Sequence, residues 1–250
     1  MANGMSYLQI KNLSKRFDDL VVLNDVSFNV KEAENLVVFG RSGTGKSVLL
    51  KCIIGLLVPD SGEIFIEDKN VHSLNKNELN NLRKRMSFLF QSAALYDSMS
   101  VRENLEFPLL RHFKMTETER RKKIMHTLEL VSLTEAIDKM PSELSGGMRK
   151  RIGLARSIIT DPKLMLYDEP TTGLDPISTK EISELIIRLQ KQLNMTSIAV
   201  THDLVCAEII SDRTIFLDKG KIIFEGTIKE LKHSNNPMLI NFISNELISE

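Results

Sequence analysis

Eight consecutive residues, Gly40–Ser47, read Gly-Arg-Ser-Gly-Thr-Gly-Lys-Ser and match the pattern G-x-x-x-x-G-K-[ST]. Glycines in this pattern let backbone N–H groups turn toward one anion, and a helix that begins at the lysine points its positive end at the same place. Lys46 would reach the β- and γ-phosphates of a nucleotide, and the Ser47 hydroxyl would bind Mg²⁺. The pattern predicts a nucleoside triphosphate site made of Gly40, Arg41, Ser42, Gly43, Thr44, Gly45, Lys46, Ser47 and Val48.

Two acidic residues, Asp168 and Glu169, follow the apolar run Leu164–Tyr167. We expect this run to be a strand buried on both faces, so its acids lie at the carboxyl edge of the sheet, where ligands of open α/β sheets bind. Asp168 suits Mg²⁺, which prefers carboxylate oxygen. Glu169 would point to the other side and polarise an attacking water. The alternative is that the acids only cap the next helix, and the phosphate loop argues against it.

The elements around these residues alternate between strand and helix. Asn35–Phe39 reads as a strand before the phosphate loop, and Val48–Leu56 has helical length behind it. Further strands are expected over 7–10, 21–23, 26–28, 63–66, 86–90, 164–167 and 197–201, with a hairpin of 214–217 and 221–224. Further helices are expected over 101–110, 117–131, 146–159, 176–192 and 204–210. This order predicts a mostly parallel sheet covered by helices, with a helical insert.

Composition limits the functional classes. The chain has 250 residues, and Lys plus Arg balance Asp plus Glu at 33 each, so no net charge favours nucleic acid. The basic run Arg149–Arg151 lacks interleaved aromatics and is expected to be a solvated helix face. No apolar run approaches the ~20 residues of a membrane-spanning helix. Cys52 and Cys206 lie in apolar surroundings and are expected to be buried free thiols, which indicates a cytoplasmic location.

Further motifs stand in the order that ATP-binding-cassette (ABC) ATPases have them, over essentially the whole chain. Leu144–Met148, which reads Leu-Ser-Gly-Gly-Met, resembles the signature loop of this family. Gly173–Asp175 is similar to its D-loop, and Thr201–Asp203 to its switch-histidine segment. Gln91 matches the glutamine of its Q-loop, and Phe17 stands where the family has an aromatic that stacks on adenine. The alternative for Phe17 is a place in the core.

The resemblance implies one nucleotide-binding domain over residues 1–250. Its fold would be the α/β P-loop NTPase (RecA-like) type, a mostly parallel sheet with an N-terminal antiparallel β subdomain. An α-helical subdomain would be inserted at about 92–160, and a helical tail would follow at about 227–250.

The resemblance also implies a homodimer, in which two copies face each other head to tail and enclose two ATP molecules. Ser145, Gly146 and Gly147 would complete the pocket of the second copy, although Ser145 alone reads at least as well as an ordinary helix N-cap. Asp175 would bridge the subunits at the same nucleotide. The family usually has Gln where this chain has Met148, so one polar contact across the dimer is lost.

The implied chemistry is ATP hydrolysis with ATP and Mg²⁺ as cofactors. A histidine by itself is more often structural, but His202 directly follows the strand 197–201 and would lie beside the γ-phosphate. The catalytic residues by resemblance are Glu169, His202 and Lys46. The Mg²⁺ ligands by resemblance are Ser47, Gln91 and Asp168.

The segment Gln91–Asn104 would help to form the groove that receives the coupling helix of a membrane permease. Leu95 and Tyr96 with Met99 would suit such an apolar socket, or would equally belong to the core of the helical subdomain. The sequence of this segment is similar to that of the ATPases of bacterial Mla/Mce-type lipid transporters. The same similarity is found in residues 42–47, in Met148, and in the tail 235–238 with Phe242. This similarity implies phospholipid transport, a lipid-carrier substrate-binding protein, and a place on the cytoplasmic side of the inner membrane.

Three alternatives are weighed against this interpretation. The first is an ABC importer or exporter for another substrate. The second is a soluble ABC ATPase that acts on ribosomes or DNA, for which one expects tandem cassettes, a coiled-coil insert or a basic balance. The third is a nucleotide-gated module without turnover, which typically loses the acid that follows the magnesium aspartate. The chain retains both Glu169 and His202.

Overall fold

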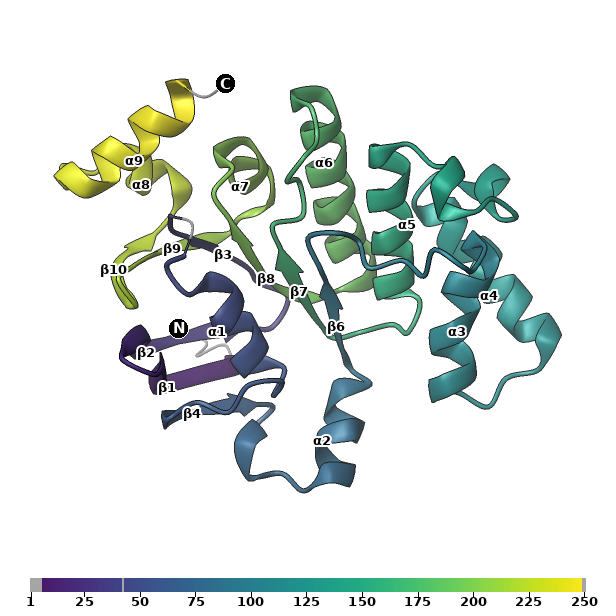
Figure 1. The fold of residues 1–250 in the computed structure, drawn as a ribbon, viewed down its shortest axis with the longest axis horizontal. Coiled ribbons are helices and arrows are strands. Elements are labelled where there is room, and N and C mark those ends of the chain that lie inside the picture. The colour runs from purple at the N-terminus through teal and green to yellow at the C-terminus, as the bar shows by residue number, and fades with distance from the viewer. Residues whose placement is uncertain (1–5, 42, 249–250) are drawn as a thin grey trace.

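The structure is a computed structural model that describes residues 6–41 and 43–248, with side chains described up to Ser244. Ser42, predicted above as a phosphate-loop residue, lies outside the described residues, as do the outermost residues of the predicted domain 1–250. The chain forms two sheets with helices around them (Figure 1). The predicted α/β fold, with a mostly parallel sheet and an antiparallel sheet at the N-terminus, is confirmed.

The larger sheet has six strands in the order β10-β9-β3-β8-β7-β6. Five of them are parallel, and only the edge strand β10 pairs antiparallel, with β9. The strands are β3 (Asn35–Phe39), β6 (Met86–Leu89), β7 (Leu164–Asp168), β8 (Thr196–Thr201), β9 (Arg213–Asp218) and β10 (Lys221–Gly226). The central strands β3, β7 and β8 are buried almost throughout, and strands buried on both faces read as continuous apolar runs, which is why they were recognisable in the sequence.

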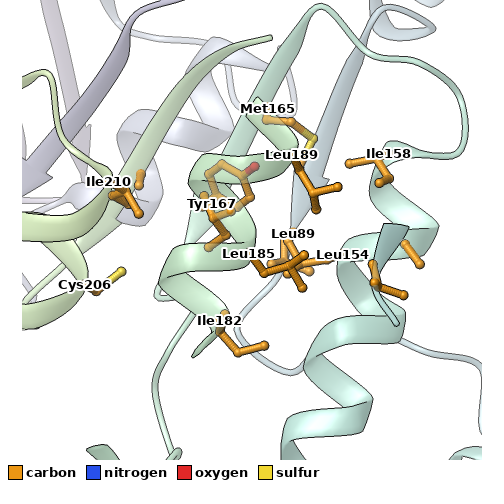
Figure 2. Close-up of a cluster of buried hydrophobic side chains, with 14 of the residues drawn as sticks. Leu89, Leu154, Ile158, Met165, Tyr167, Ile182, Leu185, Leu189, Cys206 and Ile210 are labelled. Atoms are coloured by element: carbon orange, nitrogen blue, oxygen red, sulfur yellow. The ribbon is translucent and has the colours of Figure 1, made fainter. Parts of the chain in front are cut away.

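Strand alternation divides the apolar residues of the sheet between two cores. Val37 and Tyr167 face one core, which is filled by α5 (Gly146–Ile158), α6 (Pro176–Leu193) and α7 (Leu204–Ile210). Figure 2 shows Tyr167 between Leu185 of α6 and Cys206 of α7. Val38 and its neighbours in the sheet face the second core, which α1 (Lys46–Ile53) shares with the N-terminal sheet. Cys206 and Cys52, one in each core, are buried and free, as predicted.

The smaller sheet is antiparallel, in the order β2-β1-β4-β5. Its strands are β1 (Ser6–Phe17), β2 (Leu20–Lys31), β4 (Ser61–Ile66) and β5 (Lys69–Asn70). The sequence predicted three short strands where β1 and β2 form two strands of 12 residues each. The prediction was wrong because the register shifts between β1 and β2 let the ladder continue through positions whose polarity breaks the alternation.

Helices α3 (Val101–His112), α4 (Glu117–Leu130) and α5 occupy the region predicted as a helical insert. Figure 1 shows α3 and α4 at the end of the molecule opposite the N-terminal sheet. Capping boxes at Ser100 and Thr116 fix their N-termini, which explains why the predicted starts are correct. The short 3₁₀ turns are η1 (Val71–Ser73), η2 (Thr134–Ala136) and η3 (Pro141–Glu143).

Three further helices complete the fold. The sequence analysis missed α2 (Lys76–Arg83), a polar helix whose Asn75–Glu78 capping box was the available signal. The tail contains α8 (Ile228–Lys232) and α9 (Pro237–Ile248), so its helical character is as predicted. Within the part of the chain that the structure describes, no helix has both the length and the apolar character needed to cross a bilayer.

Candidate nucleotide-binding site

A cavity of about 710 Å³ lies where β3, β7 and β8 end and the phosphate loop begins. It brings together residues from six separate parts of the sequence. The lining residues that the sequence analysis predicted are Phe17, Arg41, Gly43, Gly45, Lys46, Ser47, Val48, Gln91, Glu169 and His202. The lining residues that it did not predict are Val22, Thr172 and Phe242. The carboxyl ends of parallel strands meet at one edge, which is why these segments converge.

The phosphate loop folds tightly around its own lysine. Gly45 has φ 97° and caps α1, and a Cβ there would lie 2.7 Å from the carbonyl oxygen of Val22. Only glycine adopts this conformation without strain. The Lys46 ammonium is buried and donates hydrogen bonds to the carbonyls of Gly40 at 2.6 Å and Arg41 at 3.1 Å. The loop thus presents a fixed positive charge at the N-terminus of α1, where an anion is favoured.

Glu169 lies between two basic groups. Its Oε2 is 2.8 Å from His202 Nδ1, and its Oε1 is 3.6 Å from Lys46 Nζ. Burial raises the pKa of Glu169, but the hydrogen bond and charge of His202, together with the charge of Lys46, outweigh burial and leave the pKa below its usual range. Thr172 donates a weak hydrogen bond to the same carboxylate, at 3.4 Å. Glu169 is therefore a carboxylate held in a fixed orientation, with its charged form favoured by its neighbours.

Strand alternation predicted that Glu169 points away from the side of Asp168. Asp168 ends β7, whereas Glu169 has already left the strand and has a left-handed φ of 51°. A residue other than glycine in this region is strained, and such residues concentrate at functional sites. As a result both acids meet neighbouring residues of α1: Asp168 contacts Ser47, and Glu169 contacts Lys46. The alternation rule was wrong here because it applies only within the strand.

The Asp168 carboxylate and the Ser47 hydroxyl form a pair of oxygen ligands that fits Mg²⁺. Ser47 Oγ donates to Asp168 Oδ1 at 2.8 Å. Burial raises the pKa of Asp168, and the hydrogen bond from Ser47 opposes that rise. Among the described residues, no cluster of three His, Cys, Asp or Glu side chains could hold a metal. A site with only a few protein ligands is expected for Mg²⁺, because this ion takes its remaining ligands from phosphate oxygens and water.

The basic residues Arg149–Arg151 of α5 were expected to face solvent, but one of them binds the segment that contains Gln91. Lys150 is buried, and its ammonium donates to the carbonyl of Gln91 at 2.5 Å. Burial lowers the pKa of Lys150, and the negative charge of Glu169 opposes that shift. Arg156 donates to the carbonyl of Ala94. The prediction of a solvated face for Arg149–Arg151 was therefore wrong at Lys150, because the charge composition of a helix does not reveal which carbonyls it packs against.

Phe17 ends β1 at the mouth of the cavity and is 42% exposed. It is therefore not a core residue, which was the alternative interpretation. The Lys15 ammonium lies 5.4 Å from the centre of its ring. An exposed ring at this position has a free face on which a base can stack, and such stacking contributes about 1–3 kcal/mol.

The four predicted residues of the signature loop and D-loop do not line this cavity, and neither do the predicted residues Gly40, Thr44 and Asp168. Ser145 caps α5 by accepting a hydrogen bond from the Met148 N–H, and Asp175 caps α6 in the same way from Ser178. Gly146 and Gly147 lie beside the start of α6: added Cβ atoms would be 3.9 Å from Leu174 and 3.9 Å from Ser178. The signature and D-loop segments therefore form one surface, separate from the cavity of their own chain.

The three lining residues that the sequence analysis missed differ in the signals they gave. Val22 and Thr172 each lie close in sequence to a predicted residue, Phe17 and Glu169 respectively. Phe242 was noted only as part of the tail that is similar to lipid-transporter ATPases, and its distance in sequence from the other motifs gave no sign that it lines the cavity.

Comparison with known proteins is consistent with this geometry. The intermembrane phospholipid transport system ATP-binding protein MlaF of Haemophilus influenzae is 41% identical over 243 residues, which cover 97% of this chain and 92% of that protein. The chloroplastic protein TRIGALACTOSYLDIACYLGLYCEROL 3 of Arabidopsis thaliana is 39% identical over 261 residues, covering 96% of this chain and 74% of that protein. The dimeric cassette MJ0796, solved in a post-hydrolysis state bound to ADP and Pi, is similar with a TM-score of 0.80 at 31% identity, covering 88% of this chain and 98% of that one.

The family model described as ABC transporter matches residues 23–172. This span includes the phosphate loop, Gln91, the signature loop and both acids of the cavity. The chain therefore belongs to the ABC transporter family and is one of its ATP-binding, ATP-hydrolysing proteins.

Proposed function

We propose that the chain is the Mg²⁺-dependent ATPase subunit of a phospholipid transporter, working as a homodimer on a membrane permease. The observation that carries the cargo assignment is the 41% identity, over 97% of the chain, to a protein named for intermembrane phospholipid transport. The identity to a second protein whose name contains a glycolipid, at 39%, supports the same class of cargo.

The hydrolytic step follows from the geometry around Glu169. Its ionised carboxylate accepts a hydrogen bond from the attacking water and orients it toward the γ-phosphate. His202 holds that carboxylate at 2.8 Å and lies on the cavity wall, where it donates to the γ-phosphate. Lys46 leaves the carbonyls of its own loop when phosphate oxygens replace them, and it stabilises the negative charge that develops.

Ser47, Asp168 and Gln91 would hold Mg²⁺ in this site. When bound, the ion would neutralise negative charge on the triphosphate. Ser47 and Asp168 already meet at 2.8 Å, and Gln91 lines the same cavity. Gln91 is held through its backbone carbonyl by Lys150, so its side chain is left to reach the site.

The dimer is supported by the surface that Ser145–Gly147 shares with the D-loop. The N-terminus of α5 offers N–H groups and a hydroxyl to an anion, yet its own cavity lies elsewhere. A second copy, turned head to tail, would bring its triphosphate to this surface, and Asp175 would lie at the same junction. Ile177, which follows Asp175 at the start of α6, is exposed and would be covered by the partner. The similar MJ0796 cassette is dimeric.

A second hollow, of about 290 Å³, supports a permease contact. It lies between β6, α3 and α5, and Phe88, Phe90 and Arg156 are among its lining residues. Phe90 is 40% exposed and packs against Phe88, with ring centres 4.3 Å apart. An apolar helix of the permease would fit this groove.

The residues proposed for this contact from sequence divide between two roles. Leu95 packs against the core that α5, α6 and α7 fill, so it belongs to that core rather than to an exposed socket. Tyr96 is exposed. The Arg156 guanidinium lies 4.6 Å from its ring centre, and Phe107 contacts the same ring edge to face. The segment Gln91–Asn104 thus borders the groove through Ala93 and Ala94, and Leu95 attaches the segment to the core.

The remaining assignments rest on the same interpretation. Residues 1–250 form one nucleotide-binding domain, with a helical subdomain at about 92–160 and a tail at about 227–250. A lipid-carrier substrate-binding protein supplies or receives the cargo. The chain lies on the cytoplasmic side of the inner membrane and is held there by the permease.

The test is a complex of this chain with its partner permease, reconstituted in vesicles that contain a labelled phospholipid. We expect MgATP to drive phospholipid movement in the wild type but not in Glu169→Gln. Two outcomes would contradict the assignment. The first is lipid movement that does not depend on ATP, and the second is an ATPase rate that a small solute such as an amino acid stimulates and phospholipid does not. The second outcome would favour an importer for another substrate.

A further inference from the structure

A residue of the C-terminal tail forms part of the wall of the nucleotide cavity. Phe242 lies on α9 and lines the same cavity as Phe17, Lys46 and Glu169. Its side chain is only 3% exposed. More than 190 residues separate it from the phosphate loop, so its position depends entirely on how α9 docks. Figure 1 shows α9 beyond α8, at the end of the central sheet that carries β9 and β10.

The contacts of Phe242 are with the strand that leads into the phosphate loop and with its neighbour. Its ring centre is 5.8 Å from that of Phe39 with an interplanar angle of 65°, and 4.9 Å from that of Phe216 with an angle of 82°. Both are edge-to-face arrangements, the favoured geometry for aromatic pairs. Phe39 directly precedes Gly40, the first residue of the loop. Docking of α9 therefore packs an aromatic ring against the residue that precedes the phosphate loop.

The two faces of α9 differ in what they contact. On one face, Leu239, Phe242 and Ile243 pack in the core that α5, α6 and α7 fill. Met238 and Ile240 are 38% and 46% exposed, respectively. The inward face therefore has a defined place on this chain, and variants on the outward face change the same helix without touching the cavity.

We propose that α9 is a wall of the nucleotide site in its own chain, and that ATP binding and α9 docking stabilise each other through Phe242. A ligand that fills the cavity contacts a wall that exists only when α9 is docked. Coupling between two such events is reciprocal, so ATP tightens the docking of α9 by the same factor by which docking tightens ATP binding. This inference rests on the proposed nucleotide site, which it extends to a residue of the C-terminal tail.

The experiment compares Phe242→Ala with the matched control Ile240→Ala, in the full chain and in the Glu169→Gln background to prevent turnover. Equilibrium binding of a fluorescent ATP analogue with Mg²⁺ measures affinity. We expect Phe242→Ala to weaken binding by about fivefold or more, within the usual range of coupling factors. Ile240→Ala should bind like the parent, and Phe242→Leu, which keeps apolar bulk, should lie between the two.

Hydrogen exchange of residues 237–244 provides a second measurement that needs no substitution in α9. We expect these amides to exchange more slowly when MgATP is bound. Lys46→Ala should abolish this protection at the same ATP concentration, because it removes the binding event. If the parent protein fails to bind ATP, the nucleotide site itself is refuted. If the parent binds but Phe242→Ala binds equally well, or α9 gains no protection, only the present inference is refuted.

Protein concentration separates docking in the same chain from docking on a second copy. We expect ATP-induced protection of α9 to be the same at a low and a tenfold higher protein concentration. Protection that grows with protein concentration would mean that α9 binds the partner copy, and it would overturn the proposal.

Discussion

His202 and Glu169 are hydrogen-bonded, with Nδ1 2.8 Å from Oε2, although they follow different strands. Glu169 follows β7 and His202 follows β8, and these strands are parallel neighbours in which Asp168 is opposite Val200. The pairing therefore places the two residues side by side at the edge where the phosphate loop begins. Lys46 holds the other carboxylate oxygen at 3.6 Å. This arrangement sets the charge of Glu169 and makes its role testable.

Removal of the carboxylate charge should separate hydrolysis from binding. Glu169→Gln keeps the size of the side chain but cannot act as a base, so we expect kcat to fall by about 10²–10⁴-fold, the usual contribution of general-base catalysis. ATP affinity should change little, and MgATP should trap a dimer visible by size-exclusion chromatography with light scattering. Turnover at the wild-type rate would show that another group orients the water.

The pH profile should report the contact between His202 and Glu169. The hydrogen bond and charge of His202 lower the pKa of Glu169, whereas burial raises it. His202→Ala removes only the lowering contributions, so the pKa of Glu169 rises. The base is then lost at a higher pH as the solution is acidified, and the acidic limb of the kcat–pH profile moves to higher pH.

The control for this profile is His126→Ala, which removes an exposed histidine of α4. Its acidic limb should coincide with that of the wild type. An acidic limb that does not move in His202→Ala would mean that Glu169 is not the group that titrates in the profile.

Lys150 should position Gln91 without touching the nucleotide. Lys150→Met keeps the length of the side chain but removes the donor to the Gln91 carbonyl, a hydrogen bond of a charged group worth about 1.5–3 kcal/mol. We expect kcat to fall about tenfold or more. The Mg²⁺ concentration for half-maximal rate should rise, while the ATP affinity of the protein stays close to that of wild type.

A purely structural role for Lys150 would lower thermal stability and leave the Mg²⁺ dependence unchanged, which would contradict the positioning role. Lys150→Arg should restore part of the rate, because it retains a cationic donor. Lys122→Met, on the exposed side of α4, serves as the matched control.

The groove beside β6 should be required for the permease and not for the nucleotide. Phe90→Ser removes an exposed ring from the groove, so we expect co-purification with the permease to fall sharply while ATP binding of the isolated chain persists. Val58→Ser removes an exposed apolar side chain elsewhere and should leave the complex intact. A complete and active complex with Phe90→Ser would exclude this groove as the contact.

The local sequence was sufficient for the elements that carry the phosphate loop. Asn35–Phe39 and Leu204–Ile210 have the predicted limits, and α1 begins at Lys46 as predicted. These elements are specified by neighbouring residues: a continuous apolar run, a glycine-rich turn and helix caps. The loop motif also indicated its ligand, because phosphate binding depends on backbone N–H groups that a short segment provides by itself.

Tertiary structure alone decided which distant groups share the site. Nothing in the sequence around Lys150 shows that its ammonium is buried against Gln91, and nothing around Phe242 shows that it forms a wall of the cavity. Glu169 faces Lys46 because the chain turns left-handed just after β7. Such contacts depend on the pairing of strands and the docking of helices that are far apart along the chain, and periodicity within a segment carries no information about either.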